Sequence, residues 1–280
     1  MSKPILPLDV IGNIIESLVE DIDEGLDYVK ACSLVCHSFL PLCRAHIFSS
    51  ITIKVAGNTG SSDSDERYYS NTTEAFGQLV LETPEIARSI RNLYIIIVDP
   101  RSQSGHLFNQ VPQNLTRLQL LSLSRWCTVD WNNISSSMQH SLLNLVHIPT
   151  LSHLSLKRIK NFPISHLDTC TNLKQLFAEA LYIQLGTGEQ NESASSLLSH
   201  KPMRLQELGI KIFKMSDLLL LTARRSDGRT VLDFSGLEKI SITFLEALYA
   251  VHTRDIFRMT QQLVEVRFKG KEILNIRFAG

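Results

Sequence analysis

Three cysteines and two histidines lie close together near the N-terminus, and their types and spacing raise the question of metal chemistry. The five residues are Cys32, Cys36, His37, Cys43 and His46. Thiolates and imidazoles bind zinc, but structural zinc sites usually use close pairs such as Cys-x-x-Cys, and the sequence contains none. Free cysteine is also among the most frequently buried residue types. We therefore interpret these cysteines as packing residues, and we expect no metal site and no cofactor.

Nucleophilic catalysis is the second kind of chemistry to consider, and the sequence gives little support for it. The Gly-x-Ser-x-Gly signature of hydrolases is absent, and the lone Gly186-Thr187-Gly188 is not a phosphate-binding loop. Cys127 and Cys170 have no evident base beside them, and the Cys/His pairs of a RING ligase are missing. We predict that the protein is not an enzyme and that it acts by positioning its partners.

Composition narrows the class of protein further. The chain has 280 residues, 44% of them hydrophobic, and a formal net charge of zero. This composition is typical of a globular protein, and the zero net charge argues against general binding of nucleic acid or of a membrane surface. The sequence has no apolar segment of signal-peptide or membrane-spanning length, and it has an odd number of cysteines, five. These features favour reduced thiols and a location in the cytoplasm, the nucleus or both.

The elements that must position any functional residue begin with three short helices in residues 1–50. Leu6-Pro7 forces an extended start, and proline suits the first turn of the helix that follows. A second helix is predicted from about Tyr28, with a broad apolar face that continues to Phe39, and Pro41 starts a third. Three short amphipathic helices indicate a small bundle. The apolar face of the first helix consists of Ile11, Ile14, Ile15 and Leu18.

From residue 51 onward, short apolar strands alternate with helical patterns. The pattern apolar-x-x-apolar-x-apolar recurs eight times, and the first seven copies are 22 to 36 residues apart. These periods are close to those of leucine-rich repeats, in which each unit buries its apolar side by stacking on its neighbours. We therefore expect residues 51–280 to form an irregular leucine-rich-repeat-like α/β solenoid. The copies begin at Ile90, Leu115, Leu151, Leu173, Leu205, Leu237, Leu263 and Ile273.

This pattern predicts a mixed α/β fold with a defined arrangement. Seven strands, through Phe268, are expected to lie side by side, and the last two copies, joined by Gly270-Lys271, are expected to form a hairpin cap. Residues 51–55 are predicted to form a further strand. Helices are expected on both sides of Pro84, over Met138 to Leu145, and between Leu245 and Leu263.

Two motifs resemble those of a known family. Leu6-Pro7-x-Asp9-x-Ile11-x-x-Ile14-Ile15-x-x-Leu18, followed by Leu34-Val35-Cys36-His37-Ser38-Phe39, resembles an F-box. Segments 44–48 and 83–93 look like those of fungal, basidiomycete-type F-box proteins with leucine-rich-repeat-like C-terminal regions. The resemblance implies an N-terminal F-box bundle that docks on the Skp adaptor of an SCF ubiquitin ligase, and through it on cullin. It also implies that the repeat region recruits a protein substrate.

The resemblance further implies which residues contact the adaptor. Phe39 stands where many F-boxes carry tryptophan, and the spacer of residues 19–27 is longer than usual. Three short helices cannot bury all the apolar side chains of the F-box-like motifs, and an exposed apolar patch needs a partner. Two alternatives stay open: the residues form part of the repeat core, or the chain is an interaction scaffold with no ubiquitin role. The expected adaptor contacts are Leu6, Pro7, Leu8, Ile11, Ile14, Ile15, Leu18, Val35 and Phe39.

A second candidate surface comes from the repeats themselves. Side chains that alternate with the strand leucines should line one open face, and such a face is a candidate for substrate binding. An ordinary solvated surface is the alternative, and the sequence does not decide between them. The candidate substrate-binding residues are Arg117, Ser155, Lys157, Lys211, Lys239 and Arg267.

Overall fold

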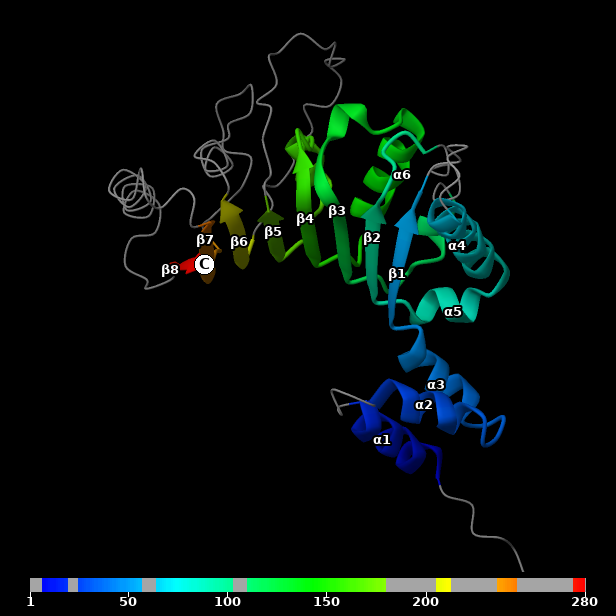
Figure 1. The fold of residues 1–280 in the computed structure, drawn as a ribbon. Helices are drawn as coiled ribbons and strands as arrows, with labels where there is room; N and C mark the ends of the chain where they lie inside the picture. Colours follow the sequence, from blue (N-terminus) through cyan, green and yellow to red (C-terminus); the bar gives the residue numbers. More distant parts are fainter. Residues whose placement is uncertain are drawn as a thin grey trace, which may run out of the picture.

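The main feature of the fold is one parallel sheet. The computed structural model of this chain describes residues 7–19, 25–56, 64–102, 110–179, 205–212, 236–245 and 274–279. Its eight strands follow one another in sequence order, and each is parallel to its neighbours (Figure 1). The predicted mixed α/β class is confirmed. The strands are β1 Ser50–Val55, β2 Asn92–Ile97, β3 Leu120–Asp130, β4 His153–Lys160, β5 Gln175–Glu179, β6 Glu207–Ile212, β7 Lys239–Leu245 and β8 Leu274–Ala279.

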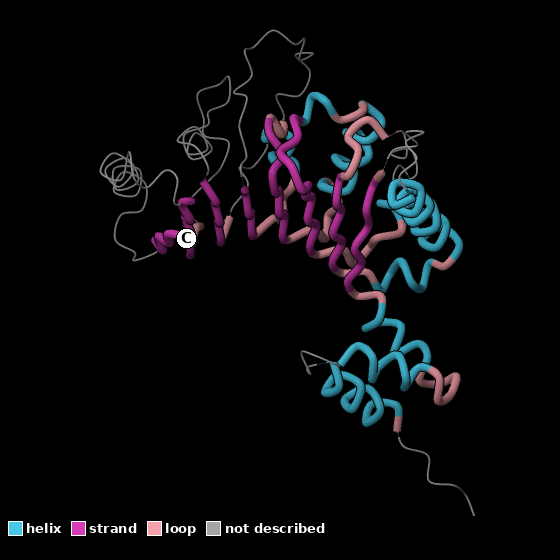
Figure 2. The backbone as a smooth tube through the Cα atoms, in the orientation of Figure 1, coloured by secondary structure: helices cyan, strands magenta, loops and turns pink. Residues whose placement is uncertain are grey.

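Three N-terminal helices pack around a small core of their own, set apart from the sheet in Figure 2. They are α1 Leu8–Val19, α2 Gly25–Ser33 and α3 Leu40–Ile47. Ile11 and Ile15 lie one turn apart on α1 and share this core with Val29 and Cys43. A Cβ atom at Gly25 would collide with the carbonyl oxygen of Leu18. Glycine therefore allows α2 to begin directly against the end of α1.

The second helix is shorter than its sequence pattern predicts. It ends at Ser33 and is followed by turns, so the expected helical face through Phe39 is wrong. The amides of Leu34 and Val35 bond to carbonyls three residues earlier, as in a tightened last helical turn. This change of direction lets α3 fold back against α2. As a result, Val35 is exposed instead of buried.

Helices of different length connect the first strands. α4 (Ser64–Glu82) and α5 (Pro84–Ser89) lie between β1 and β2, so the predicted helix start at Pro84 is confirmed. α6 (Ser136–Val146) buries Met138, Leu142 and Leu145, as expected from their spacing. Short 3-10 turns complete the connections that the structure describes, and the helix expected between Leu245 and Leu263 lies outside the described residues. These turns are η2 Val111–Gln113, η3 Trp131–Asn133 and η4 Ile164–Thr169.

A recurring hydrogen-bond arrangement sets the start of each strand from β2 to β7. One carbonyl oxygen just before or at the start of the preceding strand accepts the N–H groups of two successive residues in the next unit, at 2.7 to 3.1 Å. Ser49, for example, accepts from Arg91 and Asn92. Since the same carbonyl fixes two amides, each strand begins at the same level as the one before it. The accepting residues are Ser49, Arg91, Gln119, Ser152, Lys174 and Gln206.

Common strand starts align the apolar side chains into buried rows. Alternate residues of a strand point to one face, and residues in register on neighbouring strands lie side by side. All members of two such rows, from β2 to β7, are 0–2% exposed, and they form one continuous core with α4, α6 and the 3-10 turns. The rows are Leu93, Leu121, Leu154, Leu176, Leu208 and Ile240, and Ile95, Leu123, Leu156, Ala178, Ile210 and Ile242.

The structure corrects the predicted arrangement at two places. Leu93 pairs with Leu121, so the repeat of β3 begins at Leu118, and the copy assigned from Leu115 is three residues out of register. The dense leucines of this segment satisfy both registers in sequence. At the other end, β8 pairs directly with β7 in parallel, so the place expected for a strand ending at Phe268 is taken by residues 274–279. Residues 263–268, the other half of the expected hairpin cap, lie outside the described residues.

The register of β3 can be tested by two leucine substitutions. We expect Leu123→Ala to lower the free energy of unfolding by about 2–5 kcal/mol, because the side chain is fully buried in the core. Leu120→Ala should cost about 1 kcal/mol or less, since Leu120 lies on the opposite face and is only partly buried. Urea unfolding followed by circular dichroism measures both. Equal losses for the two variants would contradict the register.

Candidate functional site

Exposed apolar side chains are concentrated on the N-terminal helices. Seven of the nine large hydrophobic residues that are exposed in the described chain lie between residues 10 and 35. Ile14 is 49% exposed, Val35 69% and Leu34 87%. Among the described residues, four buried side chains form the core of this bundle, and none of these exposed side chains belongs to that core. We call this set the N-terminal apolar surface; it consists of Val10, Ile14, Val19, Leu26, Tyr28, Leu34 and Val35.

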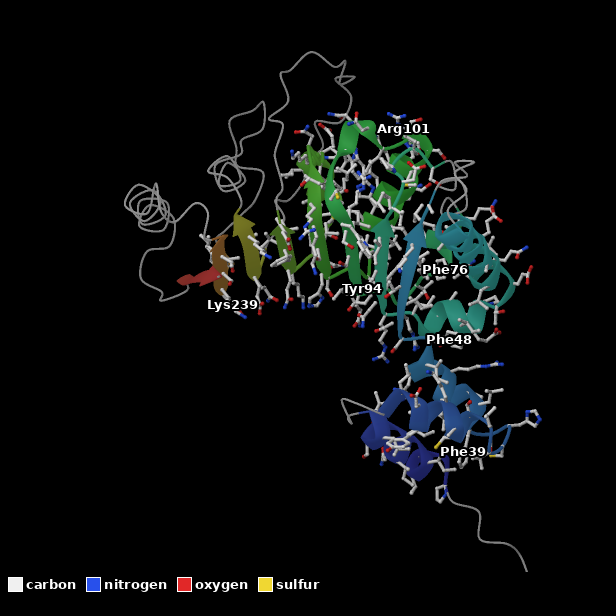
Figure 3. The ribbon with its side chains drawn as sticks, viewed as in Figure 1. Phe39, Phe48, Phe76, Tyr94, Arg101 and Lys239 are labelled. Carbon is white, nitrogen blue, oxygen red and sulfur yellow. The ribbon has the colours of Figure 1, made fainter. Side chains whose placement is uncertain are left out.

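The residues expected to contact an adaptor fall into two groups in the structure. Ile11 and Ile15 are buried at 7% and 1% exposure, and Leu18 and Phe39 pack partly buried against the same core (Figure 3 labels Phe39). These four hold the helices together. Ile14, Pro7 and Val35 are exposed and therefore accessible to a partner. Leu6 lies outside the described residues, and Leu8 begins α1.

The cysteines of this region lie in different surroundings. Cys43 is fully buried, Cys32 is partly buried against the core, and Cys36 is exposed in the turn after α2. Burial raises the pKa of the Cys43 thiol, whereas a hydrogen bond with Ser38, at 2.9 Å from Sγ to Oγ, lowers the pKa of Cys36. Among the described residues there is no group of three or more side chains that could hold a metal ion.

The second surface is the face of the sheet opposite the leucine rows, which we call the open face. Polar side chains dominate it, and Tyr94 and Lys239 in Figure 3 mark positions near its two ends. Across β2 to β7 it has three rows of residues in register. The first row is Asn92, Leu120, His153, Gln175, Glu207 and Lys239. The second is Tyr94, Ser122, Ser155, Phe177, Gly209 and Ser241. The third is Ile96, Ser124, Lys157, Glu179, Lys211 and Thr243.

An aromatic ring lies in the middle of the open face. A Cβ atom at Gly209 would be 2.7 Å from Cδ2 of Phe177, so the ring occupies the space that a side chain on β6 would fill. The ammonium group of Lys157, from the other side, lies 5.8 Å from the centre of the same ring, within the range of a cation–π interaction. Ser155 lies on β4, two residues before Lys157. Its Oγ is buried and has no hydrogen-bond partner among the described residues.

A buried carboxylate next to Phe177 forms ion pairs with two cationic side chains. Oε1 of Glu179 lies 3.4 Å from Nε of Arg158 and 3.6 Å from Nζ of Lys211, while the Glu179 side chain is only 10% exposed. These pairs draw Arg158 and Lys211 towards β5. Lys157 is the register neighbour of Glu179 on β4. We call Lys157, Arg158, Phe177, Glu179 and Lys211 the β5 cluster.

An irregularity in β3 places a tryptophan beside this cluster. The register between β3 and β4 shifts after Ser124, so residues 125–128 stand opposite Arg158 alone. Arg158 has a left-handed backbone, with φ of 61°, which a non-glycine residue rarely adopts, and its guanidinium donates a hydrogen bond to the carbonyl of Trp126. Trp126 itself is 71% exposed.

The predicted substrate-binding residues are only partly brought together. Lys157 and Lys211 belong to the β5 cluster, and Ser155 adjoins it in the second row. Lys239 lies two strands away, 3.7 Å from Glu207. Arg117 is in the turn before β3 and not on the open face, because the true register places Ser122 and Ser124 there. Arg267 lies outside the described residues.

The sequence did not lead us to Phe177 and Glu179, which lie at the centre of the cluster. Phe177 and Glu179 alternate with Leu176 and Ala178, so the same repeat pattern contained the signal for both. By contrast, Trp126 and Arg158 meet only because β3 loses its register with β4, and the repeat pattern carries no sign of that irregularity.

Two histidines lie against each other on the helix side of the sheet. The rings of His147, which follows α6, and His166, in η4, have centroids 5.8 Å apart, and Nε2 of His147 lies 3.1 Å from the His166 carbonyl oxygen. Loss of solvent around the ring lowers the pKa of His166, and the positive charges of protonated His147 and His140 lower it further. The folded chain therefore favours neutral His166.

Comparison with protein-family models, curated proteins and solved structures finds no match for this chain. None of the described helices is both long enough and apolar enough to cross a membrane.

Thiol labelling should separate the cysteines by environment. We expect iodoacetamide at neutral pH to modify Cys36 much faster than Cys43 or Cys170, because Cys36 is exposed with a lowered pKa and the other two are buried. Peptide mapping by mass spectrometry measures the rate at each cysteine, and Cys36→Ser should remove labelling of that peptide while the exposed Cys127 stays accessible to the reagent. Rapid labelling of Cys43 in the folded chain would show that the helical core is open.

The His166 environment predicts a pH dependence of stability. Because the folded pKa lies below the ordinary value of about 6.5, the unfolded chain takes up a proton first as pH falls. Stability should be fully retained above pH ~6.5 and lost as pH drops through this value. Urea midpoints at about pH 7.5 and 5.5 measure the loss, and His166→Asn should reduce it. An identical loss in the variant would assign the effect to other groups.

Proposed function

We propose that this protein is the substrate-recognition subunit of an SCF-type ubiquitin ligase. In this role the N-terminal helices are an F-box that docks on the Skp adaptor, and through it on cullin. The strands form a leucine-rich-repeat-like solenoid that holds a protein substrate. The role requires no catalytic group of its own, since ubiquitin transfer depends here on positioning.

The single observation that carries the proposal is the N-terminal apolar surface. A cluster of large apolar side chains exposed on one small bundle is unfavourable in water and typical of a surface that another protein covers. Val10 and Ile14 lie one turn apart on α1, which is the spacing used when a helix lies in a partner's groove. The resemblance of residues 6–39 to an F-box indicates the Skp adaptor as that partner.

The sheet supports the second half of the proposed role. Parallel strands in sequence order, joined from β1 to β7 by the same double hydrogen bond, are what stacked leucine-rich units require. The core of the sheet is separate from the core of the helices, so docking at one end leaves the open face uncovered. α3 leads directly into β1, and Phe48 lies at this junction in Figure 3.

Adaptor docking can be tested by substitutions that spare the helical core. We expect Ile14→Glu and Val35→Glu each to weaken binding to a purified Skp adaptor by at least about tenfold, because each places a charge in a desolvated apolar contact. Binding of the full chain is measured by calorimetry, with circular dichroism to show that the fold is kept.

A matched control and an opposite outcome complete this test. Glu16→Lys changes an exposed residue on the same helix, outside the apolar surface, and should leave the affinity within about threefold. Ile15 is unsuitable, since a charge there would unfold the bundle. If the folded chain does not bind the adaptor at all, or if both variants bind unchanged, the chain is better described as an interaction scaffold without a ubiquitin role.

A further inference from the structure

Four cationic residues lie along the edge of the sheet at which the strands begin. Arg91 and Lys174 immediately precede β2 and β5. Arg88 is in the last turn of α5, and Arg117 is in the turn before β3. In Figure 1 this edge lies on the side of the N-terminal helices. We call Arg88, Arg91, Arg117 and Lys174 the strand-start patch.

The charges of the strand-start patch are not neutralised within the described chain. All four residues are exposed. Among the described residues, none of their side chains forms an ion pair, a hydrogen bond or a ring contact. Glu85, in the first turn of α5, forms no ion pair with Arg88 three residues later. The chain has a formal net charge of zero, so this local excess of positive charge is not a general property of its surface.

The hydrogen bonds that set the strand starts also fix the backbone at two of these cations. The carbonyl oxygen of Arg91 accepts two N–H groups of the next unit at 2.8 and 3.0 Å, and that of Lys174 accepts two at 2.7 and 3.0 Å. Their own N–H groups donate to the preceding unit at 2.9 and 2.8 Å. Because both positions are held from both sides, their spacing is set before a ligand arrives, which reduces the entropy lost on binding.

The spacing of the strands sets the length of a matching ligand. Neighbouring strands lie about 4.8 Å apart, so the distance from β2 to β5 is about 14 Å, which an extended segment of about four or five residues spans. Beyond β5 the positive row ends, since the equivalent residues before β6 and β7 are Gln206 and Glu238. The patch is therefore suited to a short anionic segment.

We propose that the strand-start patch binds an acidic segment of a partner protein, which lies across the starts of β2 to β5 with its carboxylates on these cations. The proposed ligase role requires neither this surface nor an acidic partner. A nucleic-acid strand fits less well, because it would extend to Glu238 and because the residues that precede β2 to β7 include no aromatic side chain on which bases could stack.

The binding test uses the full chain without any adaptor. The probe is a fluorescein-labelled Gly/Ser peptide with a central block of five glutamates, and its control has five glutamines. We expect anisotropy to show binding of the acidic probe only, weakening as salt rises from about 50 to about 300 mM. Arg91→Glu should weaken binding about fivefold or more, since it replaces attraction with repulsion. Arg91→Gln should give an intermediate loss.

A matched variant at the other end of β2 tests the location. Arg101 is exposed in the turn after this strand, and Figure 3 labels it at the edge opposite the strand starts. Arg101→Glu makes the same change of charge as Arg91→Glu and should leave binding within about twofold. Circular dichroism shows that both variants keep the fold. Arg88 is less suitable for substitution, because a cation in the last turn stabilises a helix.

Crosslinking gives a second measure of location. A carbodiimide joins the carboxylates of the probe to lysine amines, and mass spectrometry identifies the modified lysine. We expect Lys174 to be the main site and Lys157, which is exposed on the open face, to be modified much less. Crosslinking mainly at Lys157 would move the site to the open face and contradict the proposal.

The remaining opposing outcomes are equally defined. Equal binding of the glutamine control, or equal losses for Arg91→Glu and Arg101→Glu, would overturn the proposal. Binding of a single-stranded oligonucleotide with the same number of charges, if more than about tenfold tighter than the peptide, would reassign the surface to nucleic acid. Because the adaptor is absent, these results are independent of whether the N-terminal helices dock on it.

Discussion

The structure depends on one hydrogen-bond arrangement, in which a single carbonyl oxygen receives two consecutive amides of the following unit. It recurs from Ser49 to Gln206 although the connecting segments differ in length and in secondary structure. Because one carbonyl holds two consecutive amides, the next strand has a single starting position and runs parallel to the preceding strand. The leucine rows follow from this, because strands that begin at the same level bring equivalent side chains together. Irregular connections are tolerated since only the strand starts must agree.

The same alignment separates the two faces of the sheet. Alternation sends one set of residues into the core and the other to the open face, so a single register decides both packing and surface chemistry. The β5 cluster is a product of this rule, as Lys157, Glu179 and Lys211 are neighbours only across three strands. Trp126 lies beside the β5 cluster because it is in the irregular end of β3, where the register between β3 and β4 is lost.

The N-terminal helices differ from the sheet in how their apolar side chains are distributed. Among the described residues, their own core contains four buried side chains, and most of the exposed large apolar side chains lie between residues 10 and 35. Such a bundle gains stability from the contact of α3 with α5 and from the direct connection to β1. In the proposed role, one end of the molecule is completed by a partner while the other end presents a preformed, charged surface.

The sequence by itself determined the elements whose signals are local. Helical spacing predicted the first helix and the burial of Met138, Leu142 and Leu145, and Pro84 marked a helix start. The repeated apolar pattern predicted side-by-side strands in a mixed α/β structure. The tertiary structure decided which of two leucine registers β3 adopts, that Ile11 and Ile15 face inward while Ile14 faces solvent, and that the second helix ends at Ser33. It also decided that β8 lies beside β7. The reason is that an apolar side chain indicates burial but not its neighbour, and neighbours are fixed only when several strands or helices compete for the same core.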